Sequence, residues 1–339
     1  MLAAAHTGNN FNLLRLLLAL FVVVYHLVIL SAAPQWAHLE GPFSLLAEIG
    51  VQGFFVLSGY LVYASLERSE SLALYAEKRV RRLYPAYAAV VITCAAACLT
   101  FVPEARSSLT AVGEYLGWNL VFANFMEPEL PGVFENNLIH TVNGALWTLK
   151  IEVMFYLVLP VLAWLLRVVG GARWLLIVLI YAGAEVWRVI LSDQGQSEFS
   201  RQLPGQMSFF ITGMALHRLS LRGLWLHASG LAGAALLAAS LLFDAAEPAR
   251  ALGLGAVVIW IATGWPRLPD AARFGDVSYG LYIVHFPIIQ IVVAQGLFAT
   301  PWIGVGLAIS ASVAAAFLLW YTVERPFLRK DSAYRKAGG

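Results

Sequence analysis

Long runs of apolar residues constrain most strongly what this chain can fold into. A helix that crosses a membrane needs about 20 predominantly apolar residues, and runs of that length recur along almost the whole sequence. Only 12% of the 339 residues are charged, against about 25% in a soluble domain. The sequence therefore predicts an all-α, polytopic membrane bundle.

Ten apolar runs predict about ten transmembrane helices in a single integral-membrane domain, residues 1–339. Residues 13–322 would hold the membrane-spanning part, and residues 323–339 a basic cytoplasmic tail. The first run lacks a basic start and a cleavage site, so we expect a retained helix. The segment 112–126 is interrupted by Gly and Asn, which predicts an interfacial or re-entrant piece. The expected spans are 13–32, 44–65, 84–102, 146–166, 174–191, 204–217, 226–243, 250–265, 278–297 and 301–322.

Basic residues are distributed very unevenly between the two sides of this ten-span arrangement. Of the 22 Lys and Arg residues, sixteen fall on the side that carries both termini. The opposite side has only Arg106, Arg188, Arg201 and Arg250, and Arg15 and Lys150 lie within or beside spans. Because Lys and Arg accumulate in cytoplasmic loops, we expect both termini to be cytoplasmic.

Arg15 and His26 belong to the same apolar run. Eleven helical steps overshoot three turns by about 20°, so both side chains face the same way, roughly 16 Å apart along the axis. Polar groups at this depth usually face a cavity or a partner. One interpretation is a histidine hydrogen-bonded between helices. The other is a site that holds an anion near Arg15 and uses His26 as a general base.

The segment KRVRRLYP at 78–85 places four cations beside a span, and Pro85 is expected to start or bend the next helix. These charges are typical of topology-setting loops that attract anionic lipid. They are also suited to binding phosphates, because guanidinium groups form bidentate hydrogen bonds with them.

Glu152 lies in a further apolar run, flanked by Trp147, Phe155 and Tyr156. An unpaired carboxylate there would be costly, so we expect Glu152 to pair with a cation, form hydrogen bonds or be protonated. Both a structural role between helices and a role in the site remain open.

Three other features can be explained by helix packing as well as by function. His285, with Tyr279 and Tyr282, either lines the same cavity as His26 or packs between helices. Ser58 stands between Gly53 and Gly59, which allow close helix approach. The cysteines Cys94 and Cys98 are interpreted as packing residues, since no cluster with metal-ligand spacing is visible.

Taken together and in order, these segments resemble the membrane acyltransferase-3 family. Each motif is weak alone, and it is their combination over nearly the whole chain that is specific. The matching segments are Arg15 with ten residues before His26, FFVLSGY at 54–60, Arg79-x-x-Arg82-Leu-Tyr-Pro85, Trp147 through Glu152 to Pro160, SYGLYIVHFP at 278–287, and ERPF at 324–327.

The resemblance implies transfer of an acyl group, usually acetyl, from cytosolic acyl-CoA to a hydroxyl of a surface or exported polysaccharide. It implies a bacterial inner-membrane location, a glycan acceptor that is either free or lipid-linked, membrane lipids as partners, and no nucleic acid. Acyl-CoA would be a co-substrate, with no permanently bound cofactor.

In the mechanism that we expect, Arg79 and Arg82, with Arg81 and Arg15, bind the phosphates of the donor. His26 deprotonates the acceptor hydroxyl, unless an acyl-histidine forms instead. Glu152 orients the imidazole or binds acceptor hydroxyls. Further candidates for substrate contact are His285, Tyr279, Trp147 and Ser58.

Two other classes of protein fit the same composition. A transporter or flippase for a glycan or a small anionic solute also carries intramembrane His, Glu and Arg, although we find no repeated halves with broken helices. A membrane receptor that keeps only the scaffold is the third possibility.

Overall fold

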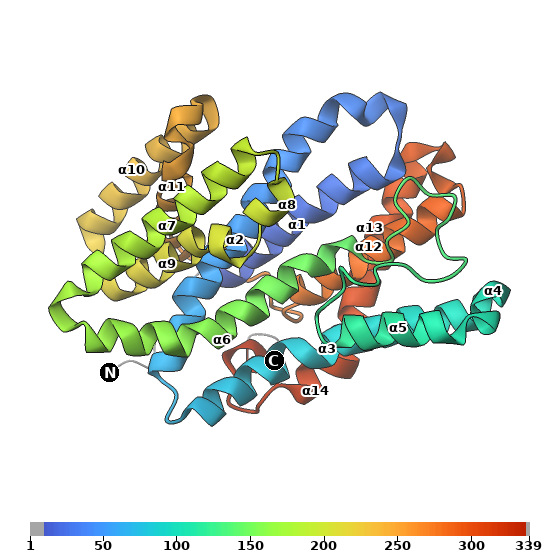
Figure 1. The fold of residues 1–339 in the computed structure, drawn as a ribbon, viewed down its shortest axis with the longest axis horizontal. Coiled ribbons are helices and arrows are strands. Elements are labelled where there is room, and N and C mark those ends of the chain that lie inside the picture. The colour runs from blue at the N-terminus through green and yellow to red at the C-terminus, as the bar shows by residue number, and fades with distance from the viewer. Residues whose placement is uncertain (1–9, 337–339) are drawn as a thin grey trace. The chain divides into compact units, whose positions relative to one another are not determined.

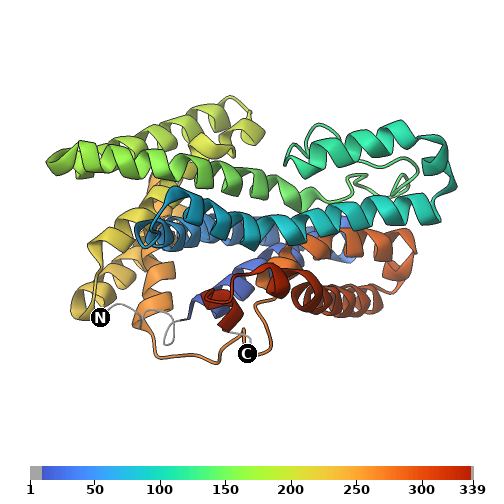
Figure 2. The same ribbon diagram turned by 90° about the horizontal axis from the view of Figure 1, so that it is seen from below.

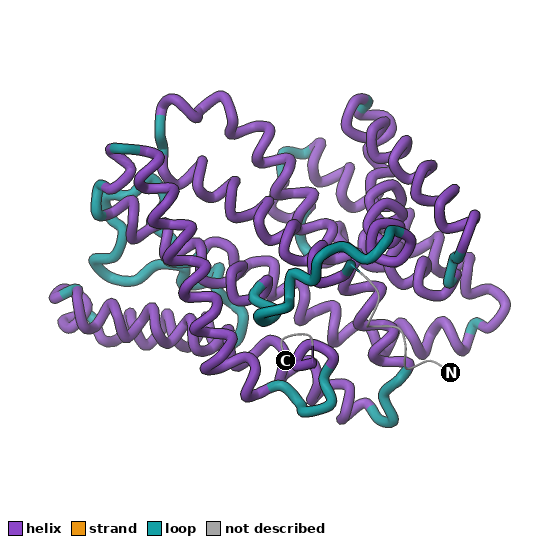
Figure 3. Tube along the Cα trace, turned by 180° about the vertical axis from the view of Figure 1, so that it is seen from behind, coloured by secondary structure: helices purple, strands orange, loops and turns teal. Residues whose placement is uncertain are grey.

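The computed structural model describes residues 10–336, which consist of helices and connecting loops without a strand (Figures 1 and 3). This confirms the predicted all-α class. The α-helices are α1 (Phe11–Ser31), α2 (Glu40–Glu67), α3 (Leu72–Phe101), α4 (Pro103–Ser107), α5 (Leu109–Leu120), α6 (Trp147–Val168), α7 (Arg173–Asp193), α8 (Ser197–Ser200), α9 (Leu203–Leu219), α10 (Gly223–Leu242), α11 (Arg250–Gly264), α12 (Ser278–Ala294), α13 (Pro301–Leu319), α14 (Arg325–Phe327) and α15 (Ala333–Lys336).

Short helical turns connect several of these helices. The 3-10 turns are η1 (Pro34–Leu39), η2 (Gly144–Leu146), η3 (Gly170–Ala172), η4 (Asp244–Ala249) and η5 (Leu297–Ala299), and η6 (Trp320–Glu324) is a π-helical turn. The π-turn follows α13 directly and leads into α14, so the chain stays helical from Pro301 to Phe327.

Each of the ten expected spans coincides with a helix. Within residues 10–336, eight helical segments are long and apolar enough to cross a membrane. The other two expected spans correspond to α9 and α12, which have 17 residues each. The chain is therefore a multi-pass membrane protein, while the number ten and the orientation of the termini stay predictions.

The start of α3 differs from the expectation. We expected a helix from residue 84, with Pro85 at its start or at a bend, whereas α3 begins at Leu72 and Pro85 lies inside it. The twelve extra residues include five charged ones, Glu77, Lys78, Arg79, Arg81 and Arg82, so an apolar run could not reveal this part of the helix. An ion pair between Glu77 and Arg81, one helical turn apart, supports this first part of the helix.

The chain divides into two compact units. Unit 1 comprises residues 1–14, 51–76 and 151–270, and unit 2 comprises residues 15–50, 77–150 and 271–339. The described part of unit 1 starts at residue 10, and that of unit 2 ends at residue 336. The expected single domain 1–339 and the last residues of the expected tail 323–339 thus extend outside the described residues.

In unit 1, small residues bring helices close together. A side chain at Gly59 of α2 would collide with the carbonyl of Phe210 in α9, and one at Gly213 would collide with the carbonyl of Val56. This agrees with the packing interpretation of Gly59. The helices α10 and α11 form an antiparallel hairpin (Figure 1).

In unit 2, α12 packs against α13, and α5 folds back along α3 (Figures 1 and 2). The Tyr87 hydroxyl of α3 donates to the carbonyl of Asn119 in α5, 2.6 Å away. The expected interfacial or re-entrant segment 112–126 therefore contains most of α5, followed by loop residues, and its place relative to the membrane stays a prediction. Polar contacts also fasten the following loop to α12, where the Asn137 amide donates to Gln290 Oε1 at 2.8 Å.

The uneven distribution of basic residues predicts a cytoplasmic C-terminus. A reporter that works only in the cytoplasm should be active when it is fused after Gly339. Alkaline phosphatase, which works only outside the cytoplasm, should be inactive when it is fused there. Phosphatase fused after Gln194, between α7 and α8, is the matched control and should be active. Phosphatase activity from the first fusion would overturn the even number of spans.

Candidate active site

Two histidines from distant parts of the sequence meet in unit 2. His26 Nδ1 of α1 lies 2.8 Å from His285 Nε2 of α12, and the two rings stack with their centroids 5.0 Å apart. His285 is completely buried, whereas His26 is only half-buried. The structure thus brings His285 to His26, as the interpretation of a shared site requires.

Hydrogen bonding assigns the tautomers of this pair. His285 Nδ1 lies 3.1 Å from the carbonyl oxygen of Leu281, and a carbonyl can only accept, so Nδ1 carries the proton. In a neutral ring the other nitrogen is then an acceptor. His285 Nε2 therefore accepts from the Nδ1–H of His26. The proton position is inferred from this network, and it leaves the lone pair of His26 on Nε2.

The segment that leads into α6 holds α12 in place beside the pair. Phe286 packs its ring edge-on against His26, with the centroids 4.9 Å apart. A side chain at Gly144 would collide with the ring of Phe286, so glycine permits this close approach. The Asn143 amide donates to the carbonyl of Ile283 at 2.8 Å.

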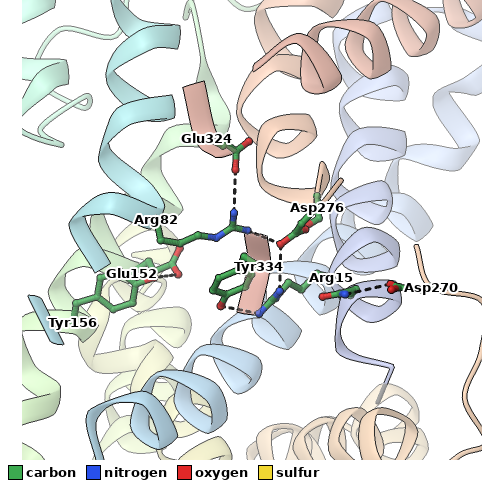
Figure 4. Close-up of polar contacts among 10 residues, drawn as sticks. Arg15, Arg82, Glu152, Tyr156, Asp270, Asp276, Glu324 and Tyr334 are labelled. Atoms are coloured by element: carbon green, nitrogen blue, oxygen red, sulfur yellow. Dashed lines mark hydrogen bonds and ion pairs between the residues drawn. The ribbon is translucent and has the colours of Figure 1, made fainter. Parts of the chain in front are cut away.

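A second polar cluster lies near the other end of α1. Arg15 forms an ion pair with Asp276 at 3.4 Å. Arg82 of α3 contacts Asp276 at 2.9 Å and Glu324 at 3.0 Å (Figure 4). Asp276 also accepts a hydrogen bond from Ser278 at 2.7 Å. We call Arg15, Arg82, Asp276 and Glu324 the ion cluster.

The ion cluster is almost fully buried. The side chains of Asp276 and Glu324 are 2% and 1% exposed, and that of Arg82 is 10% exposed. Burial alone would raise the pKa of Asp276, but the guanidiniums of Arg82 and Arg15 outweigh it and lower that pKa. Because Asp276 stays ionised at neutral pH, it holds both guanidiniums in fixed positions.

Tyr334 of α15 lies against the two guanidiniums of the cluster. Its hydroxyl accepts a hydrogen bond from Arg15 at 2.9 Å, and its ring centroid lies 4.3 Å from Arg82 Cζ. Burial would raise the pKa of Tyr334, but Arg15, Arg79 and Arg82 lower it. The C-terminal segment thus contacts the arginines that we expected at the donor site (Figure 4).

The four predicted donor-binding arginines all lie in unit 2, in different surroundings. Arg15 and Arg82 share Asp276, and Arg79 is buried. Arg81 is exposed, pairs with Glu77 at 2.8 Å and donates to the carbonyl of Phe327 at 3.3 Å. Of these four arginines, only Arg15 and Arg82 therefore belong to the ion cluster.

Tyr279 lies with the arginines rather than with the histidines. Its ring centroid is 5.5 Å from Arg82 Cζ, and its hydroxyl donates to the carbonyl of Leu83 at 2.8 Å. Tyr282 is nearer to His285, with ring centroids 6.0 Å apart, and its hydroxyl lies 2.7 Å from Thr148 Oγ1. The two tyrosines therefore have separate surroundings.

Glu152 is hydrogen-bonded within unit 1. Ser58 Oγ donates to Glu152 Oε1 at 3.3 Å, and the Tyr156 hydroxyl donates to the same oxygen. The structure thus brings Ser58 to Glu152. Of the three expected ways to stabilise this carboxylate, it shows hydrogen bonding. Trp147 begins α6 and is half-buried, on the part of that helix that belongs to unit 2.

Sequence reasoning missed Asp276, Glu324 and Tyr334. Asp276 lies two residues before the SYGLYIVHFP segment, and Glu324 begins the ERPF segment, and we considered these segments only for His285 and its tyrosines and for the family pattern. The available signal was that a buried arginine needs an anion. Nothing in the sequence around Tyr334 sets it apart from an ordinary tail residue.

Within residues 10–336, no group of three or more His, Cys, Asp or Glu side chains is arranged to hold a metal ion. Cys94 and Cys98 are both free thiols.

Sequence comparison decides the family. The pattern described as "Acyltransferase domain" matches residues 9–321. The chain belongs to the acyltransferase-3 family. Family membership and the apolar helices together make it a multi-pass membrane acyltransferase.

Named relatives cover most of the chain at low identity. Nodulation protein 10 of Rhizobium leguminosarum bv. viciae is 28% identical over 95% of this chain and 93% of its own length. The O-acetyl transferase of Shigella phage Sf6 is 28% identical over 96% and 98%. The peptidoglycan O-acetyltransferase OatA of Listeria monocytogenes is 33% identical over 54% of this chain and 29% of its own length. No solved structure matches the chain at a comparable level of significance.

Proposed function

We propose that this acyltransferase moves an acetyl group from cytosolic acetyl-CoA to a hydroxyl of a surface or exported polysaccharide, or of its lipid-linked precursor. The relatives named O-acetyl transferase and peptidoglycan O-acetyltransferase support acetyl transfer to a glycan. The excess of basic residues on one side of the predicted spans supports an orientation in which the donor binds from the cytosol, and the inner membrane of a bacterium is the location that we propose. The observation that carries the proposal is the histidine pair, which leaves His26 Nε2 free to accept a proton.

The chemical step uses the lone pair of His26. Nε2 removes the proton of the acceptor hydroxyl while the hydroxyl oxygen attacks the thioester carbonyl. The carbon–sulfur bond then breaks, and the imidazolium returns the proton to the leaving thiolate. The hydrogen bond from His26 Nδ1 to His285 Nε2 stabilises the positive charge in between.

The arginine end of unit 2 is proposed to bind the donor phosphates. Arg81, exposed and paired only with Glu77 at the surface, and Arg79 supply the phosphate contacts, while Arg15 and Arg82, held by buried carboxylates, form the floor of the site. The pantetheine arm then runs along α1 towards His26. The roughly 16 Å rise from Arg15 to His26 on one continuous helix suits an extended arm.

Purified full-length protein in lipid nanodiscs tests the proposal. With acetyl-CoA and a short glycan, it should release free thiol and produce an acetylated glycan that mass spectrometry detects. Absence of both products, together with movement of the glycan across proteoliposomes, would favour the transporter alternative.

His285 is proposed to position His26, so its replacement should act on turnover. His285→Leu removes the acceptor of the Nδ1–H, and kcat should fall about 10–100-fold, the value of one hydrogen bond to a charged group. The KM for acetyl-CoA should stay the same. His285→Gln, whose side-chain oxygen can accept that hydrogen bond, should recover part of kcat. Equal losses in both variants would mean a packing role only.

Glu152 separates two roles that the sequence left open. Because His26 Nδ1 already has His285 as its partner, we assign Glu152 to acceptor hydroxyls. Glu152→Gln should therefore raise the acceptor KM and leave hydrolysis of acetyl-CoA without acceptor unchanged. A lower kcat at unchanged KM would return Glu152 to the role of orienting the base.

A further inference from the structure

A long apolar cavity lies within unit 2 and has no part in the chemistry described above. Its volume is about 820 Å³, and its walls come from α3, α12, the end of α13 with η6, and the loop segment 130–142. On α3 the lining residues extend from Ala89 to Phe101, a rise of roughly 18 Å. The cavity therefore suits an elongated ligand rather than a compact one.

The walls of the cavity offer almost only hydrocarbon. Apart from the thiols, Thr93, Gln295 and Thr322 are the lining side chains with polar atoms. Water is not retained in apolar cavities. In a membrane protein the chemistry that fits such a space is a lipid chain.

The cavity is open along one side. Phe101 and Leu318 line it and are 81% and 65% exposed, and Ile291 of α12 is 52% exposed. Phe101 and Leu318 belong to helices that are long and apolar enough to cross a membrane, and Ile291 belongs to the shorter apolar helix α12. A chain can therefore enter sideways from the bilayer without passing through water.

A cation lies next to the last turn of α3, where Phe101 and Val102 line the cavity. The exposed Arg106 of α4 does not itself line the cavity, but it donates to the carbonyls of Leu99 and Thr100 at 2.9 and 2.6 Å. The carboxylate of Glu104 lies at the same end, against Gly132 of the cavity wall. A guanidinium has five N–H donors, so Arg106 can also bind a phosphate held just outside the apolar walls, as in a lipid whose chain carries a phosphate.

The cavity also shares a wall with the proposed catalytic pair. Val284 and Pro287 of α12 line it, while His285 of the same helix contacts His26. A chain bound there holds its head group at the end of the same helix bundle that carries the base. For a bulk phospholipid, binding beside the base has no function. For a lipid that carries the acceptor, binding there brings the acceptor close to the base.

We propose that this cavity binds the hydrocarbon chain of a polyprenyl-phosphate carrier to which the acceptor glycan is attached, with Arg106 at its phosphate. The proposal rests on the proposed function, because it names the form in which the acceptor arrives. Binding of the carrier itself needs no turnover and can be measured separately.

Two alanines on α3 provide a matched pair of variants. Ala97 lines the cavity, whereas its neighbour Ala96 is also exposed but does not line it. Ala97→Trp should raise the KM for a polyprenyl-diphosphate-linked disaccharide about tenfold, as expected if about two methylene groups lose their burial. The KM for the free disaccharide should stay unchanged, and Ala96→Trp should alter neither. Equal behaviour of the two variants would refute the site.

A photoreactive polyprenyl phosphate tests occupancy directly. In nanodiscs it should crosslink to residues 89–102 of the wild type and of Ala96→Trp, but not of Ala97→Trp, and Arg106→Ala should weaken the labelling. Unlabelled polyprenyl phosphate should compete, and phosphatidylglycerol should not. Equal competition by phosphatidylglycerol would show a bulk-lipid site and overturn the proposal. Specific labelling without any acetyl transfer would instead refute the proposed function and leave the lipid site standing.

Discussion

His26→Ala is expected to lower kcat for acetyl transfer by about 10²–10⁴-fold, the usual contribution of a general base. The protein should still insert into the membrane and bind acetyl-CoA, because the ion cluster near Arg15 makes its contacts without the imidazole. Single-turnover kinetics with purified protein, together with equilibrium binding of acetyl-CoA, measure the two effects.

The matched control is His217→Ala. His217 lies in unit 1, at the end of α9, and contacts Glu67 at 3.1 Å. Its replacement should leave kcat within a factor of about two, since surface changes usually have small effects. Near-normal turnover of His26→Ala would remove His26 from the chemistry. Acetylated protein recovered from the wild type without acceptor, and absent from His26→Ala, would instead show an acyl-histidine intermediate.

Apolar length was enough to find the helices but not where some of them start. The first apolar run and α1 agree closely, because every residue from Phe11 to Ser31 except a few is hydrophobic. At α3 the charged residues between Glu77 and Arg82 made the apolar run too short by twelve residues. The ion pair between Glu77 and Arg81 supports this part of the helix, and hydropathy cannot register such a pair.

The site was predicted in pieces rather than as contacts. The sequence singled out His26 and His285 as polar groups in apolar runs, but they are 259 positions apart, and periodicity within one helix cannot tell which distant helix it faces. The assigned tautomer depends on the carbonyl of Leu281, one turn before His285. Only the packing of α1 against α12 converts two isolated histidines into an oriented pair.

For the arginines, the sequence predicted the kind of site but not the partners of the side chains. The sequence predicted on which side of the membrane the arginines lie. That position and their guanidinium groups suggested a phosphate site. What composition cannot show is that three of them pair with carboxylates in the folded protein, Arg15 and Arg82 in the ion cluster and Arg81 with Glu77. Asp276 and Glu324 come from the C-terminal third of the chain, so the charge available to a ligand is smaller than the arginine count suggests.

Arg82→Met should be the most destabilising single change in this cluster. It leaves the ionised carboxylate of Asp276, which is 2% exposed, without its closer guanidinium. Breaking a buried ion pair from one side costs about 3–5 kcal/mol, because an uncompensated charge stays buried. The midpoint of thermal unfolding in detergent should fall accordingly. Arg81→Met, which breaks an exposed pair with Glu77, should cost about 0–1 kcal/mol.

The double variant Arg82→Met with Glu324→Gln distinguishes a structural role from a role in binding. It removes one charge of each sign and leaves Arg15 paired with Asp276, so most of the lost stability should return. If Arg82 only forms the floor of the site, the double variant should bind acetyl-CoA and acetyl-pantetheine with the wild-type ratio of affinities. Arg79→Ala and Arg81→Ala should instead lose affinity for acetyl-CoA alone, because only that donor carries the nucleotide phosphates. A stable double variant that has lost acetyl-CoA binding selectively would place Arg82 on the phosphates after all.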